Sequence, residues 1–124
     1  MDFGTALNRF RNERGLSLRE LATLSGVDHA YIHRLESGDK TAPSSDVMDK
    51  LARALKLSHV RRKFFEFTAV AGSIDDHLFE VGFKNPERLE TIKVAATMSF
   101  RGAKPLSEEE WRAKLDQIKE LIGS

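Results

Sequence analysis

The sequence lacks several features that would assign a chain quickly to a class of protein. It has no cysteine, which excludes a disulfide framework and a zinc site built from thiolates and is compatible with the cytosol. Its longest apolar stretch, around residues 69–71, is far too short to span a bilayer, and we expect no secretory signal ahead of the first helix. No internal repeat or candidate β-strand of any length is present. We therefore expect an all-α, cytoplasmic protein without a membrane partner.

An excess of charge of one sign is also missing. The net charge is +1, with nine basic against eight acidic residues up to residue 57 and eleven against eleven after it. A chain of 124 residues with 40% hydrophobic and 31% charged residues has room for one ordinary domain, or for a small domain with an appendage. This composition excludes a large enzyme and a polycation that binds nucleic acid without sequence preference.

Residues 17–38 have the pattern of two short helices joined by a tight corner. Ser17 and Glu20 have the spacing of a capping box, so the first of these helices can begin with its free amides satisfied. Gly26 can adopt the positive φ that ends this helix, and Asp28 can cap the second one. This pattern is typical of a DNA-binding helix-turn-helix.

Helical periodicity continues on both sides of the corner. The other expected helices lie at residues 5–14, 45–56, 58–72, 73–81, 85–99 and 107–122. Ser73 is expected to cap the helix that starts there and Gly82 to end it, and Asn85 with Pro86 is expected to open the next helix.

The helices group into three parts. Residues 1–57 form the expected helix-turn-helix domain, residues 58–72 a bridging helix, and residues 73–124 a small helical dimerisation and regulatory region. Within the last part, residues 100–106 have no helical period and contain Pro105, so they are expected to be an exposed connector.

The second helix of the corner has a buried and an exposed side. At about 100° per residue, Ile32 and Leu35 fall together and must face the core. The opposite side carries small and polar side chains that can enter a major groove about 12 Å wide. We expect base contacts from His29, Ala30, His33 and Arg34, with Arg34 the best candidate for two hydrogen bonds to guanine. The alternative is that these are solvent-facing residues of a small bundle.

Contacts to the DNA backbone are expected from helix N-termini and nearby polar side chains. The candidates are Ser17, Arg19, Tyr31, Lys40 and Thr41. Each of them, taken singly, could instead be an ordinary surface residue.

Two histidines in the second helix of the corner are spaced four residues apart. His29 and His33 have the spacing of zinc ligands, but Ala30 stands where a metalloprotease helix needs a glutamate, and no third ligand is evident nearby. We therefore expect no catalytic residue, metal or cofactor.

Four segments carry a highly specific combination of residues. They are RNERGLSLRELA at 11–22, SGV at 25–27, YIHRLESG at 31–38 and LARAL at 51–55. Together they resemble the phage-repressor-like (Cro-like, XRE-type) helix-turn-helix domain over residues 5–57. The resemblance implies a five-helix DNA-binding domain whose third helix reads the major groove. It also implies that Arg11 and Glu36 form a structural ion pair and do not touch DNA.

The C-terminal tail is similar to a narrower group. The segment TMSFRGAKP at 97–105 and the helix after it resemble the tail of DdrO/ImmR-like repressors, which are paired with ImmA/IrrE-type metallopeptidases. The resemblance implies a homodimer that is inactivated when the peptidase cuts the connector. We place the cleaved peptide bond between Phe100 and Arg101. The residues expected to form the dimer are Trp111, Leu115, Ile118, Leu121 and Ile122. The alternative is that this stripe completes a core within one chain.

The combined prediction is a transcriptional repressor of bacterial or phage origin that binds a palindromic double-stranded DNA operator as a homodimer near the nucleoid. The competing prediction is an antitoxin that binds a toxin through its C-terminal helices and represses its own operon. The neighbouring gene, and self-association of residues 58–124, would separate the two.

Overall fold

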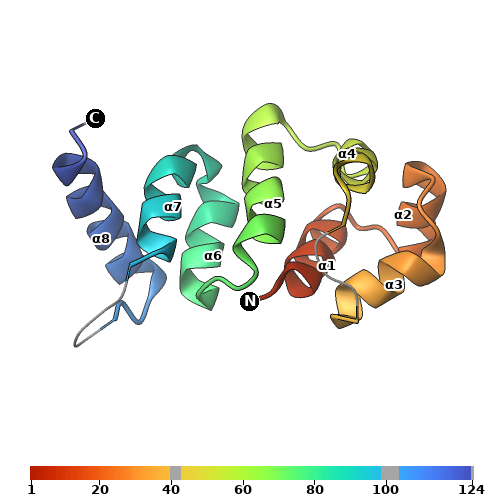
Figure 1. Cartoon of the computed structure of the whole chain (residues 1–124), viewed down its shortest axis with the longest axis horizontal. Coiled ribbons are helices and arrows are strands. Elements are labelled where there is room, and N and C mark those ends of the chain that lie inside the picture. The colour runs from red at the N-terminus through yellow and green to blue at the C-terminus, as the bar shows by residue number, and fades with distance from the viewer. Residues whose placement is uncertain (40–42, 99–103, 124) are drawn as a thin grey trace. The chain divides into compact units, whose positions relative to one another are not determined.

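The computed structural model describes residues 1–39, 43–98 and 104–123 (Figure 1). The described residues form α-helices, one short 3-10 helix and no strand beyond a single isolated bridge, which confirms the predicted all-α fold. The chain divides into two compact units, residues 1–73 and residues 74–124. The first unit contains α1 (Phe3–Glu13), α2 (Leu18–Ser25), α3 (His29–Ser37), α4 (Ser45–Ala54) and α5 (His59–Ala71). The second contains α6 (Asp76–Lys84), η1 (Pro86–Arg88), α7 (Leu89–Ala96) and α8 (Glu108–Leu121).

Local capping begins and ends the helices of the corner as predicted. The hydroxyl of Ser17 accepts a hydrogen bond from the amide of Glu20 at 3.0 Å, and the Glu20 carboxylate accepts one from the amide of Ser17 at 2.9 Å. This reciprocal pair satisfies two amides that a helix start leaves without partners. Gly26 ends α2 with φ of 73°, a left-handed conformation that glycine adopts without steric cost.

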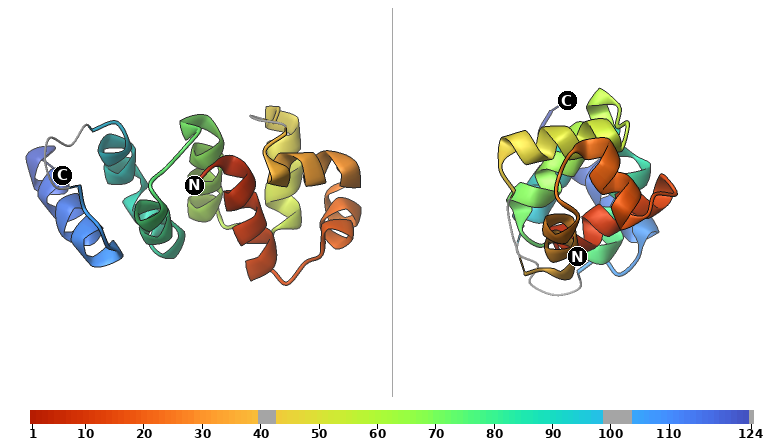
Figure 2. Two further views of the ribbon diagram at one scale, coloured as in Figure 1. Left: turned by 90° about the horizontal axis from the view of Figure 1, so that it is seen from below. Right: turned by 90° about the vertical axis from the view of Figure 1, so that its right-hand side faces the viewer.

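Helix α5 is part of the first unit and packs against α1 and α4 (Figure 2). Its fully buried Phe65 has its ring centroid 5.6 Å from that of Phe3 and 5.2 Å from that of Phe10, both on α1. Arg61 of α5 also binds Glu13 at 2.6 Å. The helix expected to bridge two parts is therefore built into the first one, because its aromatic side completes the core around α1.

Helix α1 meets the C-terminal end of α3 at a glycine. A Cβ atom added to Gly4 would collide with the carbonyl oxygen of Leu35 and would lie 2.8 Å from that of Glu36. Gly4 is buried at this crossing. The absence of a side chain thus allows the two backbones to approach each other closely.

The second unit differs from the prediction at its first helix. Asp75, and not Ser73, caps α6, and its Oδ1 accepts hydrogen bonds from the amides of His77 and Leu78 at 2.9 and 3.0 Å. The helix also continues through Gly82, which was expected to end it. The continuation brings Phe83, 7% exposed, into the interior, so burial outweighs the low helix propensity of glycine.

The start of the next helix also differs. Asn85 makes no side-chain capping bond to the segment that follows it, and Pro86 opens the 3-10 helix η1 before α7 begins at Leu89. The proline was correctly placed at a helix start, but that start is a single tight turn.

Helix α8 packs against α6 and α7 and closes the second unit. Trp111, Leu115 and Ile118 are 1%, 1% and 3% exposed, and the indole Nε1 of Trp111 donates to Asp75 at 2.9 Å. Three of the residues expected to pair between subunits therefore lie in the interior of this unit, as the alternative of a core within one chain predicts. Leu121 and Ile122 remain 85% and 50% exposed.

Candidate nucleic-acid interface

Helix α3 is held in the corner by a small number of local and buried contacts. The carboxylate of Asp28 accepts a hydrogen bond from the amide of Tyr31 at 3.1 Å and caps the helix. Ile32 and Leu35 are fully buried, as their helical spacing predicted. Gly38 ends the helix in a left-handed conformation, with φ of 87°.

The opposite side of α3 is exposed to solvent. All the residues expected to contact bases lie there, and we call this set the recognition face: His29, Ala30, His33 and Arg34. Ala30 adds no bulk near the start of the helix, while Arg34 and the histidines carry hydrogen-bond donors. A helix with one buried apolar side and one exposed polar side can lie in a major groove while its apolar side stays covered by protein.

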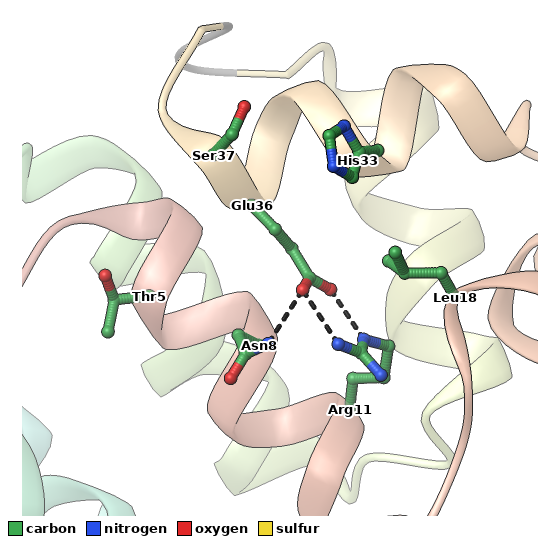
Figure 3. A pocket seen from close by; sticks show the side chains of 7 residues that line it. All are labelled: Thr5, Asn8, Arg11, Leu18, His33, Glu36 and Ser37. Atoms are coloured by element: carbon green, nitrogen blue, oxygen red, sulfur yellow. Dashed lines mark hydrogen bonds and ion pairs between the residues drawn. The ribbon is translucent and has the colours of Figure 1, made fainter.

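Glu36 ties α3 to α1 through two side chains (Figure 3). Its Oε2 accepts from Arg11 Nε at 2.7 Å, and its Oε1 accepts from Arg11 Nη2 at 3.0 Å. Asn8 Nδ2 donates to the same Oε1 at 2.9 Å. We call Glu36 with Arg11 and Asn8 the Glu36 clamp. The Arg11–Glu36 pair is the ion pair that the family resemblance implied.

The clamp also reaches the connection between α1 and α2. Arg11 Nη1 donates to the carbonyl oxygen of Leu16 at 2.8 Å, so one guanidinium joins α1, α3 and this turn. The hydrogen bond to Glu36 raises the pKa of Arg11, against the opposing effect of burial. Both side chains are mostly buried, 12% and 9% exposed, so the acid on α3 is neutralised within the protein.

The N-terminus of α2 is a less open phosphate site than its sequence suggested. The amide and hydroxyl of Ser17 both hydrogen-bond with Glu20 and lower the pKa of its carboxyl group, which keeps a negative charge at this helix start. Arg19 is exposed beside it, and Tyr31 of α3 is half-buried. A phosphate would therefore find Arg19 and the first amides of α2, with Glu20 as a competing anion.

Several predicted residues lie outside the described part of the chain. They are Lys40, Thr41, Phe100 and Arg101. Among the described residues, no group of three or more His, Cys, Asp or Glu side chains could hold a metal ion. Within the same residues, no helix is both long and apolar enough to cross a membrane.

Sequence reasoning missed Asn8 as a member of the site. Its partner Glu36 lies 28 positions away, so no local pattern connects them. The one available signal was its position three residues before Arg11, which places both side chains on the same side of a helix.

The fold and the exposed face of α3 define a helix-turn-helix DNA-binding protein. The family described as Helix-turn-helix matches residues 7–61. The chain is 30% identical over 110 residues to the HTH-type transcriptional repressor RghR of Bacillus subtilis (strain 168), covering 89% of this chain and 77% of that protein. It is 24% identical to the HTH-type transcriptional regulator SlrR of the same organism, covering 95% and 88% of the two chains. The chain belongs to the helix-turn-helix family of DNA-binding transcriptional regulators.

A further relative matches over a shorter region. The HTH-type transcriptional regulator SinR of Bacillus subtilis (strain 168) is 34% identical over 55 residues, which cover 44% of this chain and 50% of that protein. The similarity to RghR and SlrR thus extends over far more of the chain than the similarity to SinR.

Proposed function

We propose that the chain is a transcriptional repressor that binds a palindromic operator as a homodimer, with α3 in the major groove of each half-site. The observation that carries this proposal is the exposed recognition face, opposite two fully buried anchors on a short helix. The relative RghR is itself named a transcriptional repressor, which supports the same activity for this chain. Selecting bound duplexes from a random pool should enrich two inverted half-sites about 10 base pairs apart, or a multiple of that spacing. Enrichment of no sequence would refute the proposal.

Within this proposal, Arg34 contacts guanine through two hydrogen bonds, and His29 and His33 contact neighbouring base edges. Ala30 leaves room for a base or a thymine methyl group. Arg34→Ala should cost about 1–3 kcal/mol of binding free energy and relax sequence preference at one position. Arg53→Ala, which removes a 76% exposed arginine from α4, is the matched control and should leave that preference unchanged.

We assign contacts with the phosphates of the DNA backbone to Ser17, Arg19, Tyr31, Lys40 and Thr41. These contacts would set the salt dependence of binding, because each neutralised phosphate releases counterions. Arg19→Ala should weaken binding to all sequences alike and reduce the slope of log K against log salt by about 0.9. A change confined to the selected operator would contradict this assignment.

We assign the homodimer contact to the exposed end of the predicted stripe, Leu121 and Ile122. Their exposure, 85% and 50%, supports this choice over the buried members of the stripe. Sedimentation of the full chain should give the mass of a dimer, and Leu121→Ser with Ile122→Ser should shift it toward the monomer. Val70→Ser, at an 85% exposed position of α5, is the matched control and should leave the mass unchanged.

We further propose that an ImmA/IrrE-type metallopeptidase inactivates the repressor between Phe100 and Arg101, as the resemblance to DdrO/ImmR-like repressors implies. The burial of Trp111, Leu115 and Ile118 supports a physical route. After cleavage, α8 would be held by noncovalent contacts alone. These three side chains together contribute roughly 4.5–9 kcal/mol, which lies within the range of about 4–15 kcal/mol that association of a free segment costs, so α8 would be held weakly.

Helix α8 would then dissociate and expose the interior of the second unit, so the dimer and its operator affinity would be lost together. Incubating the full chain with such a peptidase should yield two fragments and abolish operator binding. If residues 95–106 stay intact, regulation by cleavage is excluded.

A further inference from the structure

We propose that Asn8 is a positioning residue for DNA recognition, acting through Glu36 on the rotation of α3 about its own axis. It lies on α1 and is not part of the recognition face. The proposal rests on the proposed function, in which α3 reads bases in the major groove. It adds a residue outside α3 whose contribution is to sequence discrimination.

Helix α3 packs against α1 and α2, and its C-terminal end meets the backbone of α1 at Gly4. It spans nine residues, and its buried side chains, Ile32 and Leu35, lie on a single stripe. Contacts along one stripe resist separation of the helix from the core much more than they resist rolling about that stripe. The Glu36 clamp lies one residue past Leu35, on the flank of the stripe, where it can oppose rolling.

The three donors of the clamp come from two positions on α1, one turn apart. Arg11 Nε and Nη2 donate to the two carboxylate oxygens of Glu36 at 2.7 and 3.0 Å. This planar pair can still rotate as a unit, because both of its hydrogen bonds come from one guanidinium. Asn8 adds a bond to Oε1 at 2.9 Å from the preceding turn of α1. The Oδ1 atom of Asn8 accepts from Asn12 Nδ2 at 2.8 Å, which orients the Asn8 amide toward Glu36. Two separated attachment points restrain the carboxylate more firmly than one.

The recognition face adjoins the clamp. His33 and Glu36, one helical turn apart, line the same pocket with Asn8 and Arg11 (Figure 3). A roll of about 10° moves an atom 5–6 Å from the helix axis by about 1 Å. Hydrogen bonds between N and O atoms tolerate a range of only about 0.5 Å. A small rotation at Glu36 is therefore enough to break base contacts from His33 or Arg34.

The clamp also controls a negative charge on the helix that faces DNA. Glu36 follows His33 by three residues, so a released carboxylate would lie close to a donor meant for bases. With Asn8 and Arg11 in place it accepts three hydrogen bonds within the protein. Asn8 thus favours both the orientation of α3 and the availability of its donors.

The test compares Asn8→Ala with Asn85→Ala, which removes a half-buried asparagine from the second unit. The measured quantity is the ratio of the Kd for a random-sequence duplex to the Kd for the selected operator, at one salt concentration. It is taken at a temperature where circular dichroism shows each variant to be folded. We expect Asn8→Ala to lower this ratio about fivefold to tenfold, a loss comparable with the net contribution of one ordinary hydrogen bond. Nonspecific binding should change less than twofold, and Asn85→Ala should change neither value.

Asn12→Ala provides a second, milder variant, because Asn12 is exposed and its Nδ2 donates to Asn8 and not to Glu36. It should lower the same ratio in the same direction by a smaller factor. A folded Asn8→Ala protein with an unchanged ratio would overturn the positioning role and leave the proposed function intact. A wild-type chain that selects no operator would overturn both. An equal loss for both duplexes would make Asn8 a residue of general affinity or stability, and would also overturn the proposal.

Discussion

Replacing Gly4 with alanine adds one methyl group where α1 crosses the end of α3. Two effects of opposite sign follow. Alanine favours the helix by up to about 1 kcal/mol relative to glycine. The added Cβ, however, would collide with the carbonyl of Leu35 and come within 2.8 Å of that of Glu36.

The collision should outweigh the gain in helix propensity. Both obstacles are backbone atoms near the end of α3, so neither can rotate away as a flexible side chain could. Overpacking of this kind typically costs about 1–3 kcal/mol, and a shift of α1 would also strain the Glu36 clamp. We therefore expect Gly4→Ala to lower the free energy of unfolding by about 1–2 kcal/mol.

Urea denaturation followed by circular dichroism measures this change. Ser45→Ala, at an exposed position in the first turn of α4, supplies the control for helix propensity and should be neutral or slightly stabilising. If Gly4→Ala is stabilising by the same amount, the close approach of α1 and α3 does not limit this position. The reasoning about the crossing would then be refuted.

Three further predictions concern charge and the second core. Arg11→Ala leaves the mostly buried Glu36 without its cation and should cost about 3 kcal/mol in urea denaturation; a loss below 1 kcal/mol would contradict this. Ile118→Ala should destabilise the second unit by about 2–4 kcal/mol, read from the fluorescence of Trp111, the one tryptophan of the chain; an unchanged midpoint would place Ile118 outside the core. Burial alone would raise the pKa of Asp75, but Lys104 at 2.6 Å, the amide of Leu78 and the indole of Trp111 hold it below its usual value. Because this pKa is lowered by folding, the resulting stability is present at neutral pH and is lost as pH falls below about 4. The melting temperature should therefore drop in acid less steeply for Asp75→Asn than for the wild type, and parallel curves would refute the assignment.

The sequence by itself determined the helices of the corner and the division of α3 into a buried and an exposed side. Caps and turns depend on atoms within a few residues, so Ser17 with Glu20, and Gly26, could be interpreted without knowing the rest of the fold. Helical periodicity likewise identified Ile32 and Leu35 as buried, because the angle per residue is constant. The exposed recognition face is the complement of that stripe.

Tertiary structure decided which distant side chains meet. Asn8 donates to Glu36, which lies 28 positions away in the sequence, and Trp111 donates to Asp75, which lies 36 positions away. No local sequence pattern connects residues so far apart. The same limit explains the errors at the second unit. An apolar stripe such as Trp111 to Ile118 requires burial but does not say against what, and a glycine such as Gly82 ends a helix only when no buried neighbour favours its continuation. Sequence specifies what must be covered, whereas the packing of α6 and α7 decides what covers it.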